Sequence, residues 1–330
     1  MNTVRPYRNQ SIEFALIKKM KNTDIAVIGA GIAGLTSAIY SGRASLETIV
    51  FEKNITGGQL ASAPLIENYP GFSAIEGNEL AAKIKNQALE NGALIEEFDT
   101  IKSVDFSDEK RIIETESAVY NAKAVIIASG TEPLKLPVAD EKERRGKGIH
   151  YCALCDGAFY KNKTVAVVGG GNSALECGLY LSGLASEVIF IIRKNSFRGE
   201  NKLINRIKSI RNIKIFYNWT VENVTGNGRV TGINIRNTKC NCERFISVDG
   251  IFCCIGSEPA TDLFRQYIDT DDYGYILTDD GMHTNIKNVF AAGDVRKKDY
   301  RQLAASVSDG AIAALNAQKN ILMDNGGKLL

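Results

Sequence analysis

Two cysteines separated by two residues are the part of this chain best suited to chemistry. They lie in the run Cys152-Ala153-Leu154-Cys155-Asp156. Cysteines at this spacing can close a small disulfide ring and reopen it by thiol–disulfide exchange. Asp156, directly after the second sulfur, could donate or accept the proton that exchange requires. The run predicts a redox-active disulfide, with Cys152, Cys155 and Asp156 as catalytic residues.

A zinc site is the alternative for these cysteines. Cys240 and Cys242 would supply the other ligands, at a C-x-C spacing tighter than that of common zinc knuckles. The seven cysteines are an odd and irregularly spaced set, unlike a secreted disulfide framework. We therefore expect no metal, a reducing cytoplasmic location, and an exposed polar loop for Cys240 and Cys242. The remaining cysteines and the neighbouring histidine are expected to be structural, with a surface position also open for the histidine: Cys177, Cys253, Cys254 and His150.

A glycine-rich segment indicates one of the elements that must position the redox pair. Gly29, Gly31 and Gly34 follow a strand-like run and open a helical one. The first glycine allows a tight turn, the second a close approach of a pyrophosphate, and the third close packing of helix on strand. Glu52 follows Gly34 by eighteen residues, at the end of the next strand, where a carboxylate can accept hydrogen bonds from ribose hydroxyls. The pattern predicts a dinucleotide site; a glycine turn without a ligand is the alternative.

A second glycine-rich segment is followed by different residues at the end of its next strand. Ile192 stands where Glu52 stands in the first copy, and basic residues follow it. Basic residues at this strand end favour a 2′-phosphate, and therefore NADPH over NADH, unless they are only solvated surface charges. The residues expected at this site are Gly169, Gly171, Asn172, Ser173, Ala174, Arg193, Lys194 and Arg198.

Internal repeats indicate the domain organisation. Residues 24–53 recur at residues 164–193, including Ala26, Val27, Leu35 and Tyr40 as Ala166, Val167, Leu175 and Tyr180, so two βαβ units are present. A shorter repeat, ASGTEP at 128–133 and CIGSEP at 254–259, brackets the second unit. We interpret it as two crossings between domains. The prediction is an α/β protein with two Rossmann-like three-layer domains on parallel sheets: residues 1–132 with 260–330, and an inserted domain at 133–259.

Periodicity predicts further elements around these units. We expect helices at 78–91 and 303–323, and strands at 93–104, 111–115, 273–278 and 289–294. Residues 1–23 form a basic extension, exposed or helical; Glu13 interrupts its apolar stretch, which disfavours a signal peptide. The net charge of +2 argues against nucleic-acid binding, and no apolar run reaches the 18 residues of a membrane span.

Three more segments complete a family resemblance. They are 57–60 with 67–71 (GGQL, ENYPG), 291–295 (AAGDV) and 300–302 (YRQ). Together with Cys-Ala-Leu-Cys-Asp-Gly they make the chain, from Asp24 to Ile321, resemble the low-molecular-weight thioredoxin reductases. Leu154 replaces the threonine of that family, Ile192 and Lys194 depart from its His-Arg-Arg-x-x-x-Arg motif, and residues 282–288 lack its Pro-Gly.

The resemblance implies a mechanism and a set of contacts. Hydride would pass from NADPH to FAD, electrons would reduce the Cys152–Cys155 disulfide, and the dithiol would reduce thioredoxin or a similar small redoxin. Cys155 would face the flavin, Cys152 would attack the partner, and Asp156 would act as general acid–base. A homodimer, and a domain rotation about the crossings in every turnover, are also implied. The residues expected at FAD are Gly29, Gly31, Gly34, Glu52, Gly58, Gln59, Leu60, Asn68, Gly130, Gly293, Asp294, Arg301 and Gln302.

Several alternatives remain open from the sequence. The acceptor could be another redoxin or a peroxidase partner, although the alkyl hydroperoxide reductase flavoprotein carries an additional N-terminal redox domain. Some relatives take electrons from ferredoxin after losing the nucleotide motif; the glycine loop at 169–174 argues against that variant. From a different class, the chain could be a nucleotide- or zinc-binding module without turnover. Asp156 and the flavin-contact segments disfavour that alternative.

Overall fold

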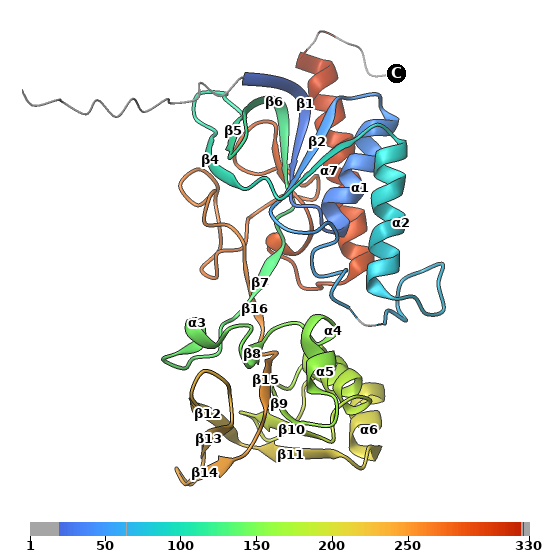
Figure 1. The fold of residues 1–330 in the computed structure, drawn as a ribbon. Helices are drawn as coiled ribbons and strands as arrows, with labels where there is room; N and C mark the ends of the chain where they lie inside the picture. The colour runs from blue at the N-terminus through green and yellow to red at the C-terminus, as the bar shows by residue number, and fades with distance from the viewer. Residues whose placement is uncertain (1–19, 64, 325, 327–330) are drawn as a thin grey trace, which may run out of the picture.

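A narrow ribbon joins two bodies in this molecule (Figure 1). The computed structural model describes residues 20–63, 65–324 and 326. The ribbon pairs β7 (Thr131–Pro133) with β16 (Ser257–Pro259) in antiparallel fashion. The chain leaves the first body in β7 and returns through β16, so the described segments before β7 and after β16 both belong to the first body.

The first body is built on a seven-stranded sheet in the order β3-β2-β1-β6-β5-β4, with β17 also on β6. Five of these strands are parallel, whereas β4 and β5 extend the sheet in antiparallel fashion. The strands are β1 (Met20–Ile28), β2 (Thr48–Glu52), β3 (Leu94–Glu97), β4 (Ile101–Asp105), β5 (Ile112–Thr115), β6 (Val119–Ile127) and β17 (Val289–Ala291).

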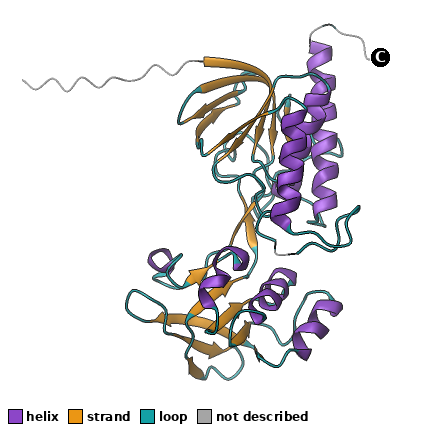
Figure 2. Ribbon diagram, turned by 45° about the vertical axis from the view of Figure 1, so that its right-hand side comes forward, coloured by secondary structure: helices purple, strands orange, loops and turns teal. Residues whose placement is uncertain are grey.

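Three helices cover one face of this sheet, as Figure 2 shows. They are α1 (Ile32–Arg43), α2 (Gly77–Glu90) and α7 (Leu303–Asp324). The α1 and α7 helices cross closely, because a Cβ on Gly310 would lie 2.2 Å from the Ala33 carbonyl oxygen. The opposite face packs against the antiparallel strands and the returning chain through Phe264, Ile268 and Ile276. Apolar burial on both faces explains the continuous apolar runs that end β1 and β6, at residues 25–28 and 124–127.

The second body has a five-stranded parallel sheet in the order β11-β10-β9-β15-β8. Helices lie on one face, and a three-stranded antiparallel sheet lies on the other. The five-stranded sheet contains β8 (Ile149–His150), β9 (Thr164–Val168), β10 (Glu187–Ile192), β11 (Ile213–Tyr217) and β15 (Gly250–Cys253). The helices are α4 (Ala153–Asp156), α5 (Asn172–Ser182) and α6 (Asn201–Ser209). The three-stranded sheet consists of β12 (Trp219–Thr225), β13 (Gly232–Asn237) and β14 (Glu243–Ile246). Short helical segments are α3 (Glu141–Arg144), η1 (Gly157–Tyr160) and η2 (Gly293–Val295).

The structure confirms the predicted fold class and the two long helices, and it corrects four elements. Residues 20–23, predicted within the basic extension, belong to β1 and pair with β6; residues 1–19 lie outside the described part. Residues 93–104 form two strands, because the backbone turns at Phe98 (φ 61°). The strand predicted at 273–278 is wrong: the Asp271 side chain accepts hydrogen bonds from the amides of Tyr273 and Tyr275 and bends the chain.

The strand predicted at 289–294 is shorter than expected. It ends at Ala291, and a single 3₁₀ turn follows. Within the described part of the chain, no helix is both long enough and apolar enough to cross a membrane.

Candidate active site

The two cysteines of the C-x-x-C run form a disulfide at the start of α4. Their Cα atoms are 5.4 Å apart, as a bridge requires. Cys152 caps the helix, and its sulfur accepts a hydrogen bond from the Cys155 amide at 3.1 Å. Cys155 is exposed and Cys152 is half-buried. The predicted disulfide is therefore present, and a second molecule can reach it.

A buried histidine lies directly behind this pair. His150 Nε2 is 2.7 Å from the Tyr160 hydroxyl, and its ring stacks on Phe252 at 5.3 Å between centroids. Its Nδ1 is 3.0 Å from Asp156 Oδ2, within ion-pair distance but without the alignment of a hydrogen bond. Burial raises the pKa of Tyr160, and the carboxylates of Asp156 and Asp249 raise it further. His150 is buried, so of the two expectations for this residue the structural one holds. Its ring lies directly behind Asp156, the predicted acid–base residue.

The first glycine turn leaves space for a ligand at one position only. A Cβ on Gly29 would lie 2.4 Å from the Ala128 carbonyl oxygen, and one on Gly34 would lie 1.9 Å from the Gly29 carbonyl oxygen. A Cβ on Gly31 would meet no atom within 4 Å. Gly31 is also the N-cap of α1, with no side chain bonded to the free amides. The turn thus offers an open approach and N–H donors, which suit a pyrophosphate.

Glu52 lies at the end of β2, beside this turn. Its carboxylate accepts hydrogen bonds from the amides of Ala30 and Asn54, both at 3.0 Å, and the residue is only 9% exposed. These bonds hold the carboxylate in one orientation. The residue type and position suit a ribose diol.

The segments expected at the flavin come together from distant parts of the chain. The Gly57 amide donates to the Ala30 carbonyl at 2.8 Å, so this loop lies against the glycine turn. Gln59 Nε2 donates to the Thr131 carbonyl at 2.8 Å, at the start of the ribbon. Asn68 Nδ2 donates to Gln302 Oε1 at 3.2 Å, across 234 residues of sequence. Leu60 is buried, and Gly58 and Gly130 have positive φ.

Asp309, which the sequence analysis missed, organises the Gly293-Asp294 turn. Its carboxylate accepts from the Gly293 amide at 3.1 Å, from Arg296 Nη1 at 2.9 Å and from Lys298 Nζ at 3.2 Å. Lys298 also pairs with Asp294 at 3.0 Å. The sequence contained one indication of this role, an acidic residue within the apolar stripe of the helix predicted at 303–323. The predicted Arg301 lies nearby, over the Tyr275 ring at 4.0 Å.

The second glycine turn repeats the geometry of the first. Gly171 is the N-cap of α5 without a side-chain cap, and a Cβ there would also meet nothing within 4 Å. The Arg198 amide donates to the Gly170 carbonyl at 2.7 Å, which brings the basic loop against the turn. Asn172 Oδ1 accepts from the Glu200 amide at 2.8 Å and fixes that loop. The remaining predicted residues divide into exposed Ser173, Arg193, Lys194 and Arg198, and buried Ala174.

The other cysteines do not join the redox pair. Cys240 and Cys242 form a second disulfide in an exposed hairpin on the opposite face of the sheet from α4. The four-cysteine zinc site considered above is therefore not assembled, and no group of three or more potential metal ligands occurs among the described residues. Burial raises the pKa of Cys253 to about 12; the neighbouring Cys254 thiol and burial raise that of Cys177.

Comparison with known proteins decides the family. Residues 23–310 match the model of the pyridine nucleotide-disulphide oxidoreductase family. The chain belongs to this family. Membership confirms the predicted enzyme class, an oxidoreductase, and the predicted cofactor pair, FAD and NADPH, which these enzymes bind.

Individual relatives cover nearly the whole chain. Thioredoxin reductase of Listeria monocytogenes is 42% identical over 90% of this chain and 93% of its own length. A 34.2 kDa protein in the rubredoxin operon of Clostridium pasteurianum is 43% identical over 94% of this chain and 100% of its own. The solved structure of Lactococcus lactis thioredoxin reductase in its FR conformation superposes with a TM-score of 0.88, at 33% identity, covering 91% of this chain and 99% of that one.

Proposed function

We propose that this oxidoreductase is an NADPH-dependent thioredoxin reductase that contains FAD. The observation that carries the proposal is the accessible Cys152–Cys155 disulfide, with Asp156 beside it, on the same body as the second glycine turn. The similarity to enzymes named thioredoxin reductase, such as that of Listeria monocytogenes, supports the choice of acceptor.

Each body has its own cofactor in this proposal. The FAD-binding domain comprises residues 1–132 and 260–330, and the NADPH-binding domain comprises residues 133–259. The open position at Gly31, the oriented Glu52 carboxylate and the Asn68–Gln302 contact support the first assignment. The open position at Gly171 and the basic loop beside it support the second. FAD, when bound, supplies the electron transfer between the nicotinamide and the disulfide.

The chain's own residues perform the disulfide exchange. Cys152 Sγ attacks the redoxin disulfide and forms a mixed disulfide; Cys155 Sγ then attacks Cys152 Sγ, which releases the reduced redoxin and restores the Cys152–Cys155 bond. Asp156 moves the proton, and the buried His150 ring, which is bonded to Tyr160, lies 3.0 Å from its carboxylate. The exposed side of α4 is where the partner binds.

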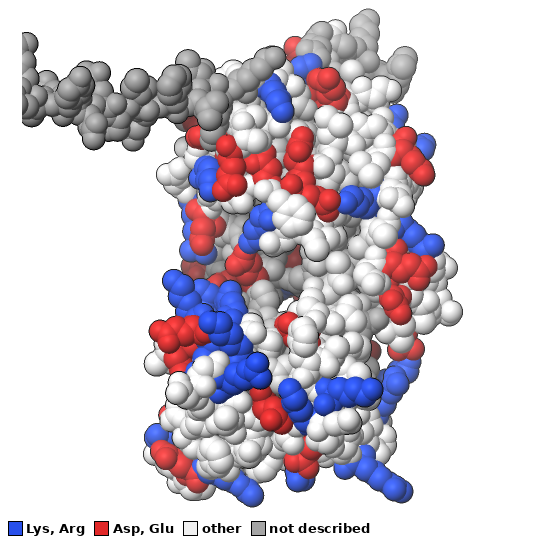
Figure 3. All heavy atoms as spheres, viewed as in Figure 1, with Lys and Arg blue, Asp and Glu red and all other residues white. Residues whose placement is uncertain are grey.

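One flank of the second body carries positive charge. Lys and Arg side chains gather over the region of α3, on the flank of the second body (Figure 3). The exposed basic residues of this flank are Lys135, Lys142, Arg145 and Lys147, and Glu143 is exposed among them. Arg144 of α3 donates to the Gly226 carbonyl in the loop between β12 and β13, so this flank lies on the side of the second body away from α4 (Figure 1).

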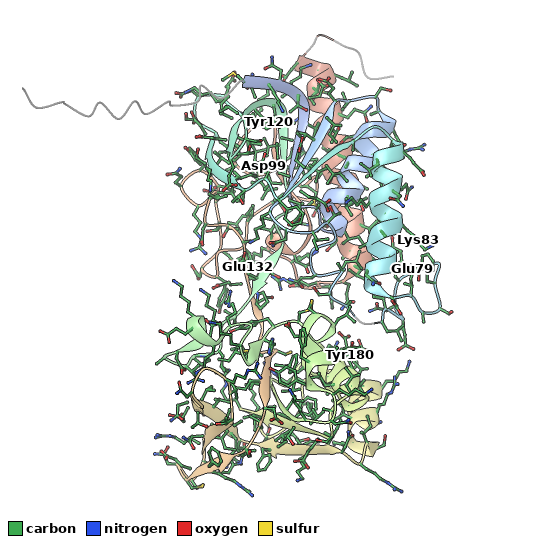
Figure 4. All side chains as sticks on the ribbon, in the orientation of Figure 1. Glu79, Lys83, Asp99, Tyr120, Glu132 and Tyr180 are labelled. Carbon is green, nitrogen blue, oxygen red and sulfur yellow. A yellow bond between two sulfur atoms is a disulfide. The ribbon has the colours of Figure 1, made fainter. Side chains whose placement is uncertain are left out.

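The geometry also supports a rotation of the second body during turnover. The predicted NADPH site and the disulfide lie on the same body, yet both must reach the flavin in turn. The connection between the bodies is slender: Figure 4 shows Glu132 in the ribbon between them, where its side chain pairs with Lys53. A contact across the bodies, Lys202 with Glu67 at 3.9 Å, joins exposed side chains and stabilises little.

The function is tested by turnover of the purified protein with NADPH or NADH and a panel of redoxins. We expect yellow protein with one FAD per chain, bleaching by NADPH, and thioredoxin reduction that Cys152→Ser or Cys155→Ser abolishes. Colourless protein that FAD cannot reconstitute contradicts the cofactor assignment. Faster turnover with another redoxin would identify that redoxin, and not thioredoxin, as the acceptor. Reduction of the protein by ferredoxin but not by NADPH would identify the ferredoxin-driven alternative.

The rotation is tested by locking the bodies. Cysteines introduced at Glu67 and Lys202 are joined by a short bismaleimide, while the disulfides protect the native exposed cysteines. The locked protein should keep FAD but lose thioredoxin turnover, and the same variant without the linker is the control. Normal turnover by the locked protein contradicts the rotation. A homodimer is tested by sedimentation, and the cytoplasmic location stays a prediction from cysteine usage.

A further inference from the structure

The hairpin between β13 and β14 carries a second disulfide that the proposed reaction does not use. Cys240 and Cys242 are bonded across a single residue, with Cα atoms 5.3 Å apart. Asn241 between them adopts a left-handed conformation (φ 58°), which asparagine tolerates better than most residues. The bridge closes a small ring at the tip of the hairpin, not a crosslink between elements.

Bonds that do not involve sulfur hold this tip. Asn237 Oδ1 accepts from the amides of Lys239 at 2.9 Å and Cys240 at 3.1 Å. The Asn237 amide donates to the Cys242 carbonyl at 2.9 Å, and the Asn241 amide donates to the Asn237 carbonyl at 3.0 Å. Because none of these bonds involves a sulfur atom, reduction breaks none of them directly, and we expect the two thiols to stay close enough for the ring to close again. Opening the disulfide therefore leaves the hairpin folded.

The tip is open to a second molecule. Every residue from Lys239 to Phe245 is exposed, so a thiolate can approach either sulfur. Lys239 directly precedes Cys240, and a positive charge beside a cysteine favours the thiolate that exchange requires. Arg236, in the strand leading to the tip, already pairs with Glu243 at 2.9 Å and Glu222 at 3.4 Å.

The electrons cannot come directly from Cys152 of the same chain. Ala153 of α4 packs in the apolar cluster with α5, whereas Ile233 and Ile235 of β13 pack in the cluster on the other face of the five-stranded sheet. Figure 1 places β14 at the end of the second body remote from α4. A diffusing carrier must therefore connect the two pairs.

We propose that Cys240 and Cys242 form a second thiol–disulfide exchange site, which accepts two electrons from a small dithiol protein, the reduced redoxin. The identity of this donor rests on the proposed function, since the enzyme itself would produce it. A dithiol is favoured over a monothiol by the geometry. After a monothiol attacks one sulfur, the other thiol is held close by the Asn237 bonds and expels it, whereas a dithiol completes the reaction with its own second thiol.

The exchange balances without another reactant. A redoxin thiolate attacks Sγ of Cys240 or Cys242; the bond between these sulfurs breaks, a mixed disulfide forms, and the leaving sulfur takes a proton. The second redoxin thiol then attacks the mixed disulfide. The redoxin leaves oxidised, and Cys240 and Cys242 are both thiols: two electrons and two protons have moved to the enzyme.

The first experiment does not depend on NADPH. A full-length chain with Cys152→Ser and Cys155→Ser is oxidised in air and mixed with thioredoxin that has been reduced chemically and freed of reductant. Alkylation and peptide mass spectrometry should find two new thiols per chain, at Cys240 and Cys242. Glutathione at the same thiol concentration should leave most of the pair oxidised. A thioredoxin that lacks its second cysteine is a monothiol, and it should likewise leave most of the pair oxidised.

Two results of this experiment overturn the proposal. One is a pair that stays oxidised while thioredoxin fully reduces insulin in the same tube. The other is a pair of free thiols in the air-oxidised starting protein, because the site would then hold no disulfide to exchange.

The second experiment uses the unmodified enzyme. It is titrated anaerobically with NADPH and a trace of thioredoxin, in parallel with the double variant Cys240→Ser, Cys242→Ser. The unmodified enzyme should consume one NADPH more per chain, since the pair accepts two electrons, while both proteins turn over excess thioredoxin equally fast. Equal consumption contradicts the proposal. If NADPH fails to reduce thioredoxin at all, the proposed function fails, and the first experiment still decides whether the exchange site exists.

Discussion

Two glycines of the same turn should respond in opposite ways to the same substitution. In Gly31→Ala, the new Cβ meets no atom within 4 Å, and the backbone (φ −72°, ψ −178°) is one that alanine adopts freely. In Gly34→Ala, the new Cβ lies 1.9 Å from the Gly29 carbonyl oxygen. Gly31 therefore faces the space assigned to the FAD pyrophosphate, whereas Gly34 faces the protein.

The magnitudes follow from these contacts. Gly31→Ala replaces a favoured N-cap residue by a poorer one, so the FAD-free protein should lose at most about 1 kcal/mol of stability. Relief of the Gly34 overlap requires α1 to move away from the turn, because the obstacle is backbone and not a flexible side chain. Overpacking of this kind costs about 1–3 kcal/mol, and more where backbone must shift.

The assay separates folding from cofactor binding. Unfolding of the FAD-free proteins in denaturant gives the free energies, and titration with FAD, followed by flavin fluorescence, gives the affinities. Gly31→Ala should fold like the unmodified chain and bind FAD at least about tenfold more weakly, since a bond to a charged group is worth about 1.5–3 kcal/mol. Gly171→Ala, the matched change at the other turn, should keep FAD and lose affinity for NADPH.

One outcome would refute this reasoning outright. If Gly31→Ala binds FAD as tightly as the unmodified protein, the pyrophosphate does not approach the backbone at Gly31. A Gly34→Ala protein of unchanged stability would contradict the close packing of α1 on the turn.

Three further predictions concern single side chains. Arg193→Ala or Arg198→Ala should raise KM for NADPH about tenfold to a hundredfold with little effect on NADH, by steady-state kinetics; equal KM values for both nucleotides in the unmodified enzyme would argue against a 2′-phosphate site. Glu97→Gln removes a carboxylate whose pKa is lowered from 4.5 to about 2 by its bond to the Lys85 ammonium and by Thr56, whose amide donates to it. Because the folded-state pKa is depressed, the contribution of this carboxylate to stability is present above about pH 4.5 and is lost as the pH falls toward 2, so the unfolding curves of the two proteins should differ at pH 7 and converge near pH 2. Tyr160→Phe removes the hydroxyl bonded to His150 Nε2 and should cost about 1–3 kcal/mol in the free energy of unfolding; an unchanged denaturation midpoint would show that this bond contributes nothing.

Most of the fold could be predicted from the sequence because the strongest signals in the sequence are local and repeated. A glycine turn between an apolar strand and a helix is specified within about a dozen residues, and its second copy at 169–174 excluded coincidence. The crossings were predictable for the same reason, and β7 and β16 do pair where the short repeat ends. The helix at 303–323 was predictable from its continuous apolar stripe, which packs on α1.

The missed features depend on contacts between distant residues. Nothing local to Asp309 shows that the amide of Gly293 and two basic side chains converge on it. The start of β1 was missed because Met20 to Thr23 are mostly exposed and polar, so only their pairing with β6 makes them a strand. The pairing of Cys240 with Cys242 depends on the bonds of Asn237, which spacing does not reveal.

The arrangement of the two bodies itself argues for motion. Three residues in β7 and three in β16 connect them, and Gly130 and Gly256 flank these strands with φ of +66° and +123°. At the second-body end, a Cβ on Gly256 would come no closer than 3.4 Å to another atom, Leu134 Cδ1, so packing there does not oppose a change of backbone angle. The ribbon is anchored to the first body, where Gln59 holds Thr131. Rotation should therefore concentrate at the ends of the ribbon toward the second body, near Leu134 and Gly256, and carry the disulfide and the NADPH site together as one rigid unit.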